Sequence, residues 1–228
     1  DGPVLSGAPQ GWRERYSGVC DPCFQAGVAC PHYREVPLRV LILGHNPSDK
    51  AWTTGVSYGN PSNRFWPLLR ESGILPADWR AGDTWVELNN KAPAEQGIGF
   101  TDLGCVPGSD AAAFSRDRLR QWQKGFAARA RAHVARSGGE PVVVAMTGKR
   151  HWDMMFSPPL KNKTQFGPQT ARPEGWPFEE SEVWVLPSPS GRAAMTSEAR
   201  IAPYRELSAR LRALGVWTPV GPTPDDSP

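Results

Sequence analysis

The stretch Leu38-Arg39-Val40-Leu41-Ile42-Leu43, followed directly by Gly44-His45-Asn46-Pro47-Ser48, decides the fold of this chain. A run rich in valine, isoleucine and leucine that ends in glycine and Asn-Pro is typical of a buried parallel strand leading into a tight loop. Open α/β sheets bind their ligands beyond the carboxyl ends of such strands. The stretch therefore predicts a parallel sheet with a ligand site at residues 44–48. The alternative is an ordinary turn between a strand and a helix.

Two further apolar runs, Val142–Met146 and Val183–Leu186, have the composition of buried strands. Helical patterns separate the apolar runs, with helices predicted from Pro61 to Gly73, from Ser115 to Arg136 and from Ala202 to Leu214. Strands that alternate with helices predict an α/β fold. We expect a three-layer sandwich, in which a central, mostly parallel sheet is flanked by helices.

The two later helices carry clear apolar stripes. The first is predicted to bury Leu119, Trp122, Phe126, Ala130 and Val134. Its other faces carry a row of cations typical of a solvated surface, with contact to phosphate as the alternative: Arg116, Arg118, Arg120, Lys124, Arg129, Arg131 and Arg136. The last helix is predicted to bury Tyr204, Leu207, Leu211 and Leu214, with Pro203 in its first turn.

Length and charge limit the remaining organisation. A chain of 228 residues, 39% of them hydrophobic, predicts one α/β domain with a small addition. We place a Cys- and His-bearing appendage at residues 1–37, the main domain at 38–216 and a loose, proline-rich tail at 217–228. The net charge of +3 restricts any nucleic-acid surface to a local patch. No apolar run is long enough to span a bilayer, so no membrane partner is expected.

Three more loops carry polar groups of the kind found in sites. Asp102 follows the glycine-rich segment Gly97-Ile98-Gly99-Phe100-Thr101. Three roles are open for it: a general base, a group that positions water, or a residue that only makes a turn. Thr147-Gly148-Lys149 follows the second apolar run, where amides and a lysine can meet an anion. Leu186-Pro187-Ser188-Pro189-Ser190-Gly191-Arg192 follows the third. We expect these loops to meet at one rim of the sheet.

These motifs resemble the mismatch-specific uracil/thymine-DNA glycosylases of the uracil-DNA glycosylase superfamily. The family's first motif, Gly-Ile-Asn-Pro-Gly, corresponds to residues 44–48, and its Pro-x-Asn-x-Phe-Trp segment corresponds to residues 61–66. Gly97 to Asp102 is similar to the family's Gly-Ile-Gly-Phe-Thr-Asn, Thr147-Gly148-Lys149 to its Asn-Gly-Lys, and residues 186–192 to its second motif. The similarity extends from about Leu38 to Gly215.

The resemblance implies a DNA repair enzyme that flips uracil, with thymine as a further substrate, out of mismatches with guanine. It then hydrolyses the N-glycosidic bond and leaves an abasic site. It implies catalytic roles for Asn46 and Asp102, of which Asn46 is expected to hold the water. The residues that it places around the base are Gly44, His45, Ala51, Gly55 and Tyr58. Those that it places on DNA are Lys149, Ser188, Ser190, Gly191 and Arg192, the last as a wedge in the emptied stack.

The chain departs from the family pattern at three of these positions. His45 replaces isoleucine, Ser48 replaces glycine, and Asp102 replaces the commoner asparagine. A carboxylate at position 102 is able to activate the water directly or to stabilise the sugar cation. The small Ala51 leaves room for a thymine methyl group. The predicted partner is double-stranded DNA with a G·U or G·T mismatch, and the predicted enzyme is a monomer without a cofactor in its chemistry.

The cysteine pattern near the start predicts a metal site. Cys20-x-x-Cys23, followed by Cys30 and His32, has the opening of a structural zinc knot. A Cys3His zinc site is preferred because a segment with so little apolar periodicity needs a metal or a cross-link to stabilise its fold. The alternatives are reduced structural thiols or a disulfide.

Two other functions remain open. One is a uracil-only or damaged-base glycosylase of the same fold. The other is a catalytically weak module that binds mismatched DNA. The chain begins at Asp1, which indicates a trimmed native start, so the expected compartment stays general: the nucleus or a DNA-containing organelle in a eukaryote, and otherwise the cytoplasm.

Overall fold

A computed structural model of the protein describes residues 13–79, 84–108, 110, 114–191 and 194–222. In this part of the chain a five-stranded sheet has the order β2-β1-β3-β5-β4. Its strands are Val40–Gly44 (β1), Ile98–Asp102 (β2), Val143–Thr147 (β3), Gly167–Gln169 (β4) and Glu182–Leu186 (β5). Strands β2, β1, β3 and β5 run parallel, whereas β4 is antiparallel to β5. The predicted α/β class with a mostly parallel sheet is confirmed.

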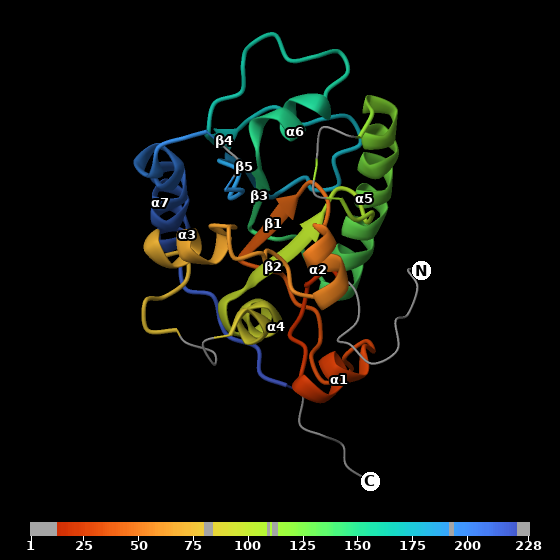
Figure 1. The fold of residues 1–228 in the computed structure, drawn as a ribbon, viewed down its shortest axis with the longest axis vertical. Helices are drawn as coiled ribbons and strands as arrows, with labels where there is room; N and C mark the ends of the chain where they lie inside the picture. The colour runs from red at the N-terminus through yellow and green to blue at the C-terminus, as the bar shows by residue number, and fades with distance from the viewer. Residues whose placement is uncertain (1–12, 80–83, 109, 111–113, 192–193, 223–228) are drawn as a thin grey trace.

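Helices lie on both faces of this sheet (Figure 1). They are Asp21–Ala26 (α1), Asp49–Thr54 (α2), Phe65–Glu71 (α3), Trp85–Gln96 (α4), Arg116–Ser137 (α5), Lys149–Met154 (α6) and Ser197–Ala213 (α7). Helices α3, α4 and α7 pack on one face and share one apolar core, while α5 and α6 pack on the other face around a second core. No helix among the described residues is long and apolar enough to cross a membrane.

Strand β1 lies in the middle of the three layers. Val40 and Ile42 point into the core under α3, α4 and α7, whereas Leu41 and Leu43 point into the core under α5. All four side chains are fully buried. A strand that is buried on both faces shows no alternation of apolar and polar residues, which is why the apolar run was a reliable sign of the fold.

The long helix predicted from Ser115 is confirmed as α5. The hydroxyl of Ser115 accepts a hydrogen bond from the amide of Arg118, as an N-cap does. Of the predicted apolar stripe, Val134 is partly buried and the other members are buried.

Helix α7 begins earlier than the prediction. The hydroxyl of Thr196 accepts from the amide of Ala199 and starts the helix there, so Pro203 lies inside the helix rather than in its first turn. Leu214 is 39% exposed, and the prediction that it is buried was wrong. The cap, and not the apolar period, sets the helix start.

Helix α3 begins later than predicted, at Phe65 instead of near Pro61. The side-chain oxygen of Asn63 accepts from the amide of Phe65 at 2.9 Å and turns the chain into the helix. Pro61 and Ser62 lie in a turn, and the helix ends at Glu71, so it covers only residues 65–71 of the predicted element.

The glycine-rich segment predicted as a loop is strand β2. A Cβ atom built on Gly99 would stand 2.3 Å from Leu38 Cδ1 and 2.8 Å from the carbonyl oxygen of Arg15. The glycine therefore serves close packing at this position, although glycine ordinarily weakens a strand. Helices α1, α2 and α4 and strand β4 were also not predicted.

Both ends of the described chain contact the main domain. Tyr16 is buried in the core under α5, and the indole of Trp217 donates to the carbonyl of Pro37 at 3.2 Å. The amide of Val220 donates to the carbonyl of Ala94 at 2.7 Å. The boundaries at residues 37 and 216 stay predictions.

A pair of substitutions tests the central position of β1. Ile42→Ala removes a fully buried side chain, so we expect it to lower the free energy of unfolding by about 2–5 kcal/mol. Val142→Ala, at a side chain that is 43% exposed next to β3, is expected to cost about 0.5 kcal/mol or less. Denaturant unfolding measures both values, and equal losses would contradict this core.

Candidate active site

The site is built on the close approach of two strand ends. In the register of the sheet, Gly44 at the end of β1 lies beside Asp102 at the end of β2. A Cβ atom on Gly44 would stand 1.9 Å from Asp102 Oδ1 and 3.0 Å from the hydroxyl oxygen of Tyr58. Only a residue without a side chain leaves space for the carboxyl group here.

A cleft of about 300 Å³ opens at these strand ends. Of the residues predicted for base contact, DNA contact or catalysis, those that line it are Gly44, His45, Asn46, Ala51, Tyr58, Asp102, Ser188, Ser190 and Gly191. Gly55 and Lys149 are not among the described residues that line it, and Arg192 lies outside the described residues. The structure thus brings the loops after β1, β2 and β5 to one cleft, together with Thr147 at the end of β3 and His151 in α6.

Asn46 is held in one orientation by its neighbours. Its Nδ2 donates to the carbonyl oxygens of Val106 at 3.1 Å and Gly108 at 3.0 Å. Two carbonyl acceptors require an NH2 group at this end of the amide, so the opposite atom is the oxygen. That oxygen lies 2.7 Å from Nδ1 of His45, which must donate to it. The amide oxygen keeps a second lone pair for another partner.

His45 is one of two stacked imidazoles beside Asn46. Its ring lies 3.9 Å from the ring of His151, centroid to centroid, with an interplanar angle of 24°. Burial lowers the pKa of His45, and burial together with His45 lowers the pKa of His151 to about 4. Both rings are therefore neutral at neutral pH. His151 lines the cleft but was missed in the sequence, because a histidine near Lys149 has no distinguishing pattern.

Asp102 lies in a dry environment. Burial, as the largest cause, and the charge of Glu14 raise the pKa of its carboxyl group to about 8, against a smaller lowering by Arg129. The group is therefore mostly protonated at pH 7 and ionises as the pH rises through about 8. A neutral carboxyl group donates a hydrogen bond, whereas the ionised form accepts a proton.

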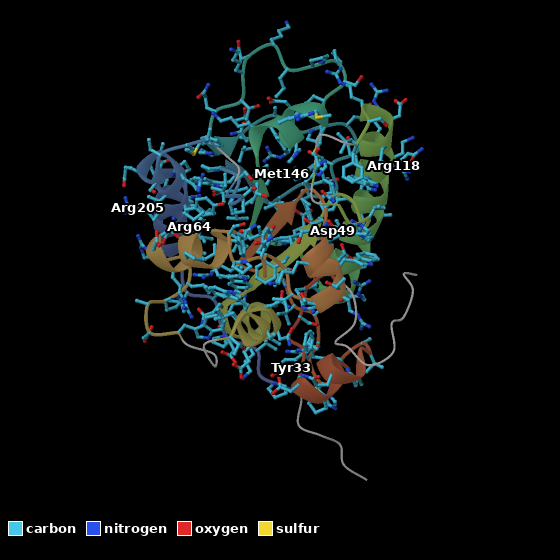
Figure 2. The ribbon with its side chains drawn as sticks, in the orientation of Figure 1. Tyr33, Asp49, Arg64, Arg118, Met146 and Arg205 are labelled. Carbon is cyan, nitrogen blue, oxygen red and sulfur yellow. The ribbon has the colours of Figure 1, made fainter. Side chains whose placement is uncertain are left out.

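Arg129 ties α5 to the strand that carries Asp102. Its guanidinium donates to the carbonyl oxygen of Asp102 at 2.7 Å and to the carboxylate of Glu14 at 2.8 Å. Arg129 was predicted to lie on a solvated face, and that prediction was wrong for this residue. Its side chain is only 27% exposed because α5 turns this position toward β2 and Glu14. Arg118, by contrast, projects from the outer side of α5 (Figure 2).

The comparison with known families agrees with this geometry. The family model described as the Uracil DNA glycosylase superfamily matches residues 31–212. The chain belongs to this superfamily. Membership makes the protein a DNA glycosylase, a hydrolase of DNA repair, and the fold is the one expected for it. The match covers the strand ends and the loops that form the cleft.

The loop that carries Tyr58 in this glycosylase is fixed from both sides. The amide of Ser57 donates to Asn89 Oδ1 at 3.0 Å, and its carbonyl accepts from the indole of Trp66 at 3.1 Å. Tyr58 has a φ of 57°, which is strained for a residue with a side chain. Its ring stacks on Phe65 at 3.8 Å between centroids, so one face of the ring is already covered.

Helix α2 closes the cleft on another side. The hydroxyl of Ser48 accepts from the amide of Ala51 and caps the helix, which explains a serine where glycine is usual. Ala51 is buried and lines the cleft. Gly55 ends the helix with a φ of 72°, and its carbonyl accepts from Arg15 at 3.1 Å, so its contacts are with the N-terminal segment.

The loop after β5 lies against the loop before α3. The amide of Arg64 donates to the carbonyl of Pro189 at 2.9 Å. A Cβ atom on Gly191 would stand 2.8 Å from the carbonyl oxygen of Ser62, so glycine permits this contact. Lys149 begins α6, and its Nζ lies 3.8 Å from the centroid of the Phe166 ring. The cysteines and histidine of the predicted metal site lie apart, and none of them lines the cleft.

The titration of Asp102 gives a direct test of this electrostatic arrangement. We expect its carboxyl group to titrate near pH 8, and Glu14→Gln to lower that pKa because a nearby negative charge is removed. Glu174→Gln changes an exposed glutamate that does not act on Asp102, and we expect no shift. NMR of the Asp102 carboxyl carbon as a function of pH measures this pKa in all three proteins. A pKa near 4 in the unaltered protein would contradict the buried site.

Proposed function

We propose that this glycosylase removes uracil and thymine from mismatches with guanine in double-stranded DNA. It hydrolyses the N-glycosidic bond and leaves an abasic site. The observation that carries the proposal is the convergence of Asn46 and Asp102 on one cleft of a chain that belongs to the uracil DNA glycosylase superfamily. Each of the following features supports a part of it.

The size of the cleft suits one flipped base. Its volume of about 300 Å³ lies at the lower end of the range for small-molecule sites, about 300–1,000 Å³. A base inside a duplex cannot reach such a cleft, so the nucleotide must leave the stack. Flipping costs a few kcal/mol and is cheapest for a mispaired base, which favours G·U and G·T pairs.

Asn46 is the group that holds the attacking water in this proposal. Its Nδ2 is committed to two backbone carbonyls and its oxygen accepts from His45. The remaining lone pair of that oxygen accepts a hydrogen bond from water. Because the amide cannot rotate without losing these bonds, the water is oriented before the sugar reacts.

The neutral groups around Asn46 fit the charges that develop. Cleavage places positive charge on the sugar and negative charge on the departing pyrimidine, which fixed hydrogen-bond donors stabilise. A protonated Asp102 and neutral imidazoles at His45 and His151 add no negative charge that would repel the pyrimidine. Above about pH 8 the carboxylate of Asp102 becomes available as a base for the water.

The reaction needs no attacking amine. No lysine is among the described residues that line the cleft, which supports a monofunctional enzyme using water as its nucleophile. We assign no cofactor to the chemistry and propose that the enzyme acts as a monomer. The small side chain of Ala51 at the cleft supports thymine as a substrate beside uracil, because it leaves room for the methyl group.

The DNA duplex is proposed to lie over the loop after β5. Ser188, Ser190 and Gly191 line the cleft rim and would contact the phosphates beside the flipped nucleotide. Arg192 follows them directly in the sequence and is proposed as the wedge that fills the emptied stack. Lys149 is proposed to contact the DNA backbone from the start of α6.

A panel of labelled oligonucleotides tests the activity. The substrates are duplexes with U·G, T·G or U·A pairs and a single strand with uracil, each treated with alkali after incubation to cleave abasic sites. We expect cleavage of U·G and T·G and little cleavage of U·A. Cleavage at uracil in every context would favour a uracil-only enzyme, and binding to mismatches without cleavage would favour a binding module.

Asn46→Ala tests the mechanism in the same assay. Losing the oriented water should lower the single-turnover rate by roughly 10²- to 10⁴-fold while the fold is kept. Asn162→Ala, at an exposed asparagine outside the cleft, is the matched control and should cleave normally. A normal single-turnover rate in Asn46→Ala would contradict the proposed role of this residue.

A further inference from the structure

Four ligand-type side chains gather in the N-terminal segment, away from the cleft. The cluster comprises Cys20, Cys23, Cys30 and His32, and their donor atoms all lie within 4.8 Å of one another. Cys20 directly precedes α1 and Cys23 lies in its first turn, while the other two come from the loop after the helix. The cysteine spacing thus brings together donors from both sides of a short helix.

The distances within the cluster match one tetrahedral ion. Nδ1 of His32 lies 3.2, 3.5 and 3.6 Å from the sulfur atoms of Cys20, Cys23 and Cys30. The sulfur atoms of Cys20 and Cys30 are 3.7 Å apart. Tetrahedral zinc with Zn–S bonds of about 2.3 Å and Zn–N bonds of about 2.0 Å places its donors about 3.5–3.8 Å apart.

Two other arrangements fit these distances less well. A disulfide needs sulfur atoms about 2.05 Å apart, and all of these cysteines are free. In a 4Fe–4S cluster each ligand binds a different iron atom, and in a 2Fe–2S cluster two irons share the four ligands, so the four donors do not surround one ion. Three thiolates and one imidazole around a single centre form a known structural zinc set.

The segment that carries the cluster covers the open edge of the sheet. Strand β2 is the edge strand, and the amide and carbonyl of Arg15 pair with the carbonyl and amide of Phe100 at 2.8 and 2.9 Å. The guanidinium of Arg15 reaches the carbonyl of Gly55 at the end of α2. The carboxylate of Glu14 accepts from Thr101 and from Arg129, next to Asp102.

Beyond these polar contacts, the segment has few apolar side chains of its own to hold it in place. Helix α1 has six residues, far fewer than a helix needs to be stable by itself. Tyr16, Cys23 and Phe24 are its buried apolar residues between positions 13 and 35. At the foot of the molecule Tyr33 lies beside α1 (Figure 2), and its ring packs against the backbone of Gly18.

We propose that Cys20, Cys23, Cys30 and His32 bind one zinc ion, which holds residues 13–35 on the open edge of β2. The ion is structural. It acts on the active site through three contacts of the segment. The backbone of Arg15 pairs with Phe100, the carboxylate of Glu14 binds Arg129, and the guanidinium of Arg15 donates to the carbonyl of Gly55. Zinc thereby stabilises the strand that ends in Asp102 and the helix that carries Ala51, without touching the substrate.

Metal analysis of the full chain, purified without chelators, tests the site. We expect one zinc ion per chain, and loss of this zinc in Cys30→Ser. Cys105→Ser is the matched control because Cys105 is a free cysteine outside the cluster, and it should keep its zinc. Absence of metal, iron with a visible cluster absorption, or zinc retained in Cys30→Ser would each overturn the proposal.

Cobalt replacement and hydrogen exchange test the geometry and the anchoring, even if Cys30→Ser does not fold. Co(II) bound in place of zinc should give the intense visible bands of a tetrahedral thiolate site. Chelation of zinc from the unaltered protein should speed amide exchange at Arg15 and Phe100, while central strand β3 stays protected. Unchanged exchange at Arg15 and Phe100 after verified removal of zinc would overturn the anchoring role.

Discussion

The contact between Gly44 and Asp102 is the constraint on which the rest of the site depends. The parallel register of β1 and β2 places these residues side by side, and the carboxyl group occupies the space that any side chain at position 44 would need. Asn46 comes two residues after Gly44 and lines the same cleft. Because both strands are buried, this geometry is fixed by the core and not by the loops themselves.

Burial also sets the charge state of the cleft. Asp102, His45 and His151 have pKa values shifted toward their neutral forms, each with desolvation as the largest cause. A cleft with few charges strengthens each directed hydrogen bond in it, because a medium of low polarity screens less. The orientation of Asn46 by two carbonyls and an imidazole is therefore a stronger restraint here than it would be in water.

The surroundings of the cleft are supported from distant parts of the chain. Arg129 on α5 holds the backbone at Asp102, and Asn89 on α4 holds the loop that places Tyr58 in a strained conformation. The N-terminal segment reaches the same region through Glu14 and Arg15. The family match at residues 31–212 includes α4 and α5, whereas Glu14 and Arg15 lie before it.

The sequence by itself determined the apolar strands β1, β3 and β5, the capped helix α5, the motif at residues 44–48 and the ligand types of the cysteine cluster, because each is a local pattern. It could not identify β2, because Gly99 weakens a strand pattern but is required for close packing against Leu38 and Arg15. It also missed His151, Glu14 and the inward turn of Arg129. Only the tertiary structure decided these, since their roles arise from neighbours that are remote in sequence.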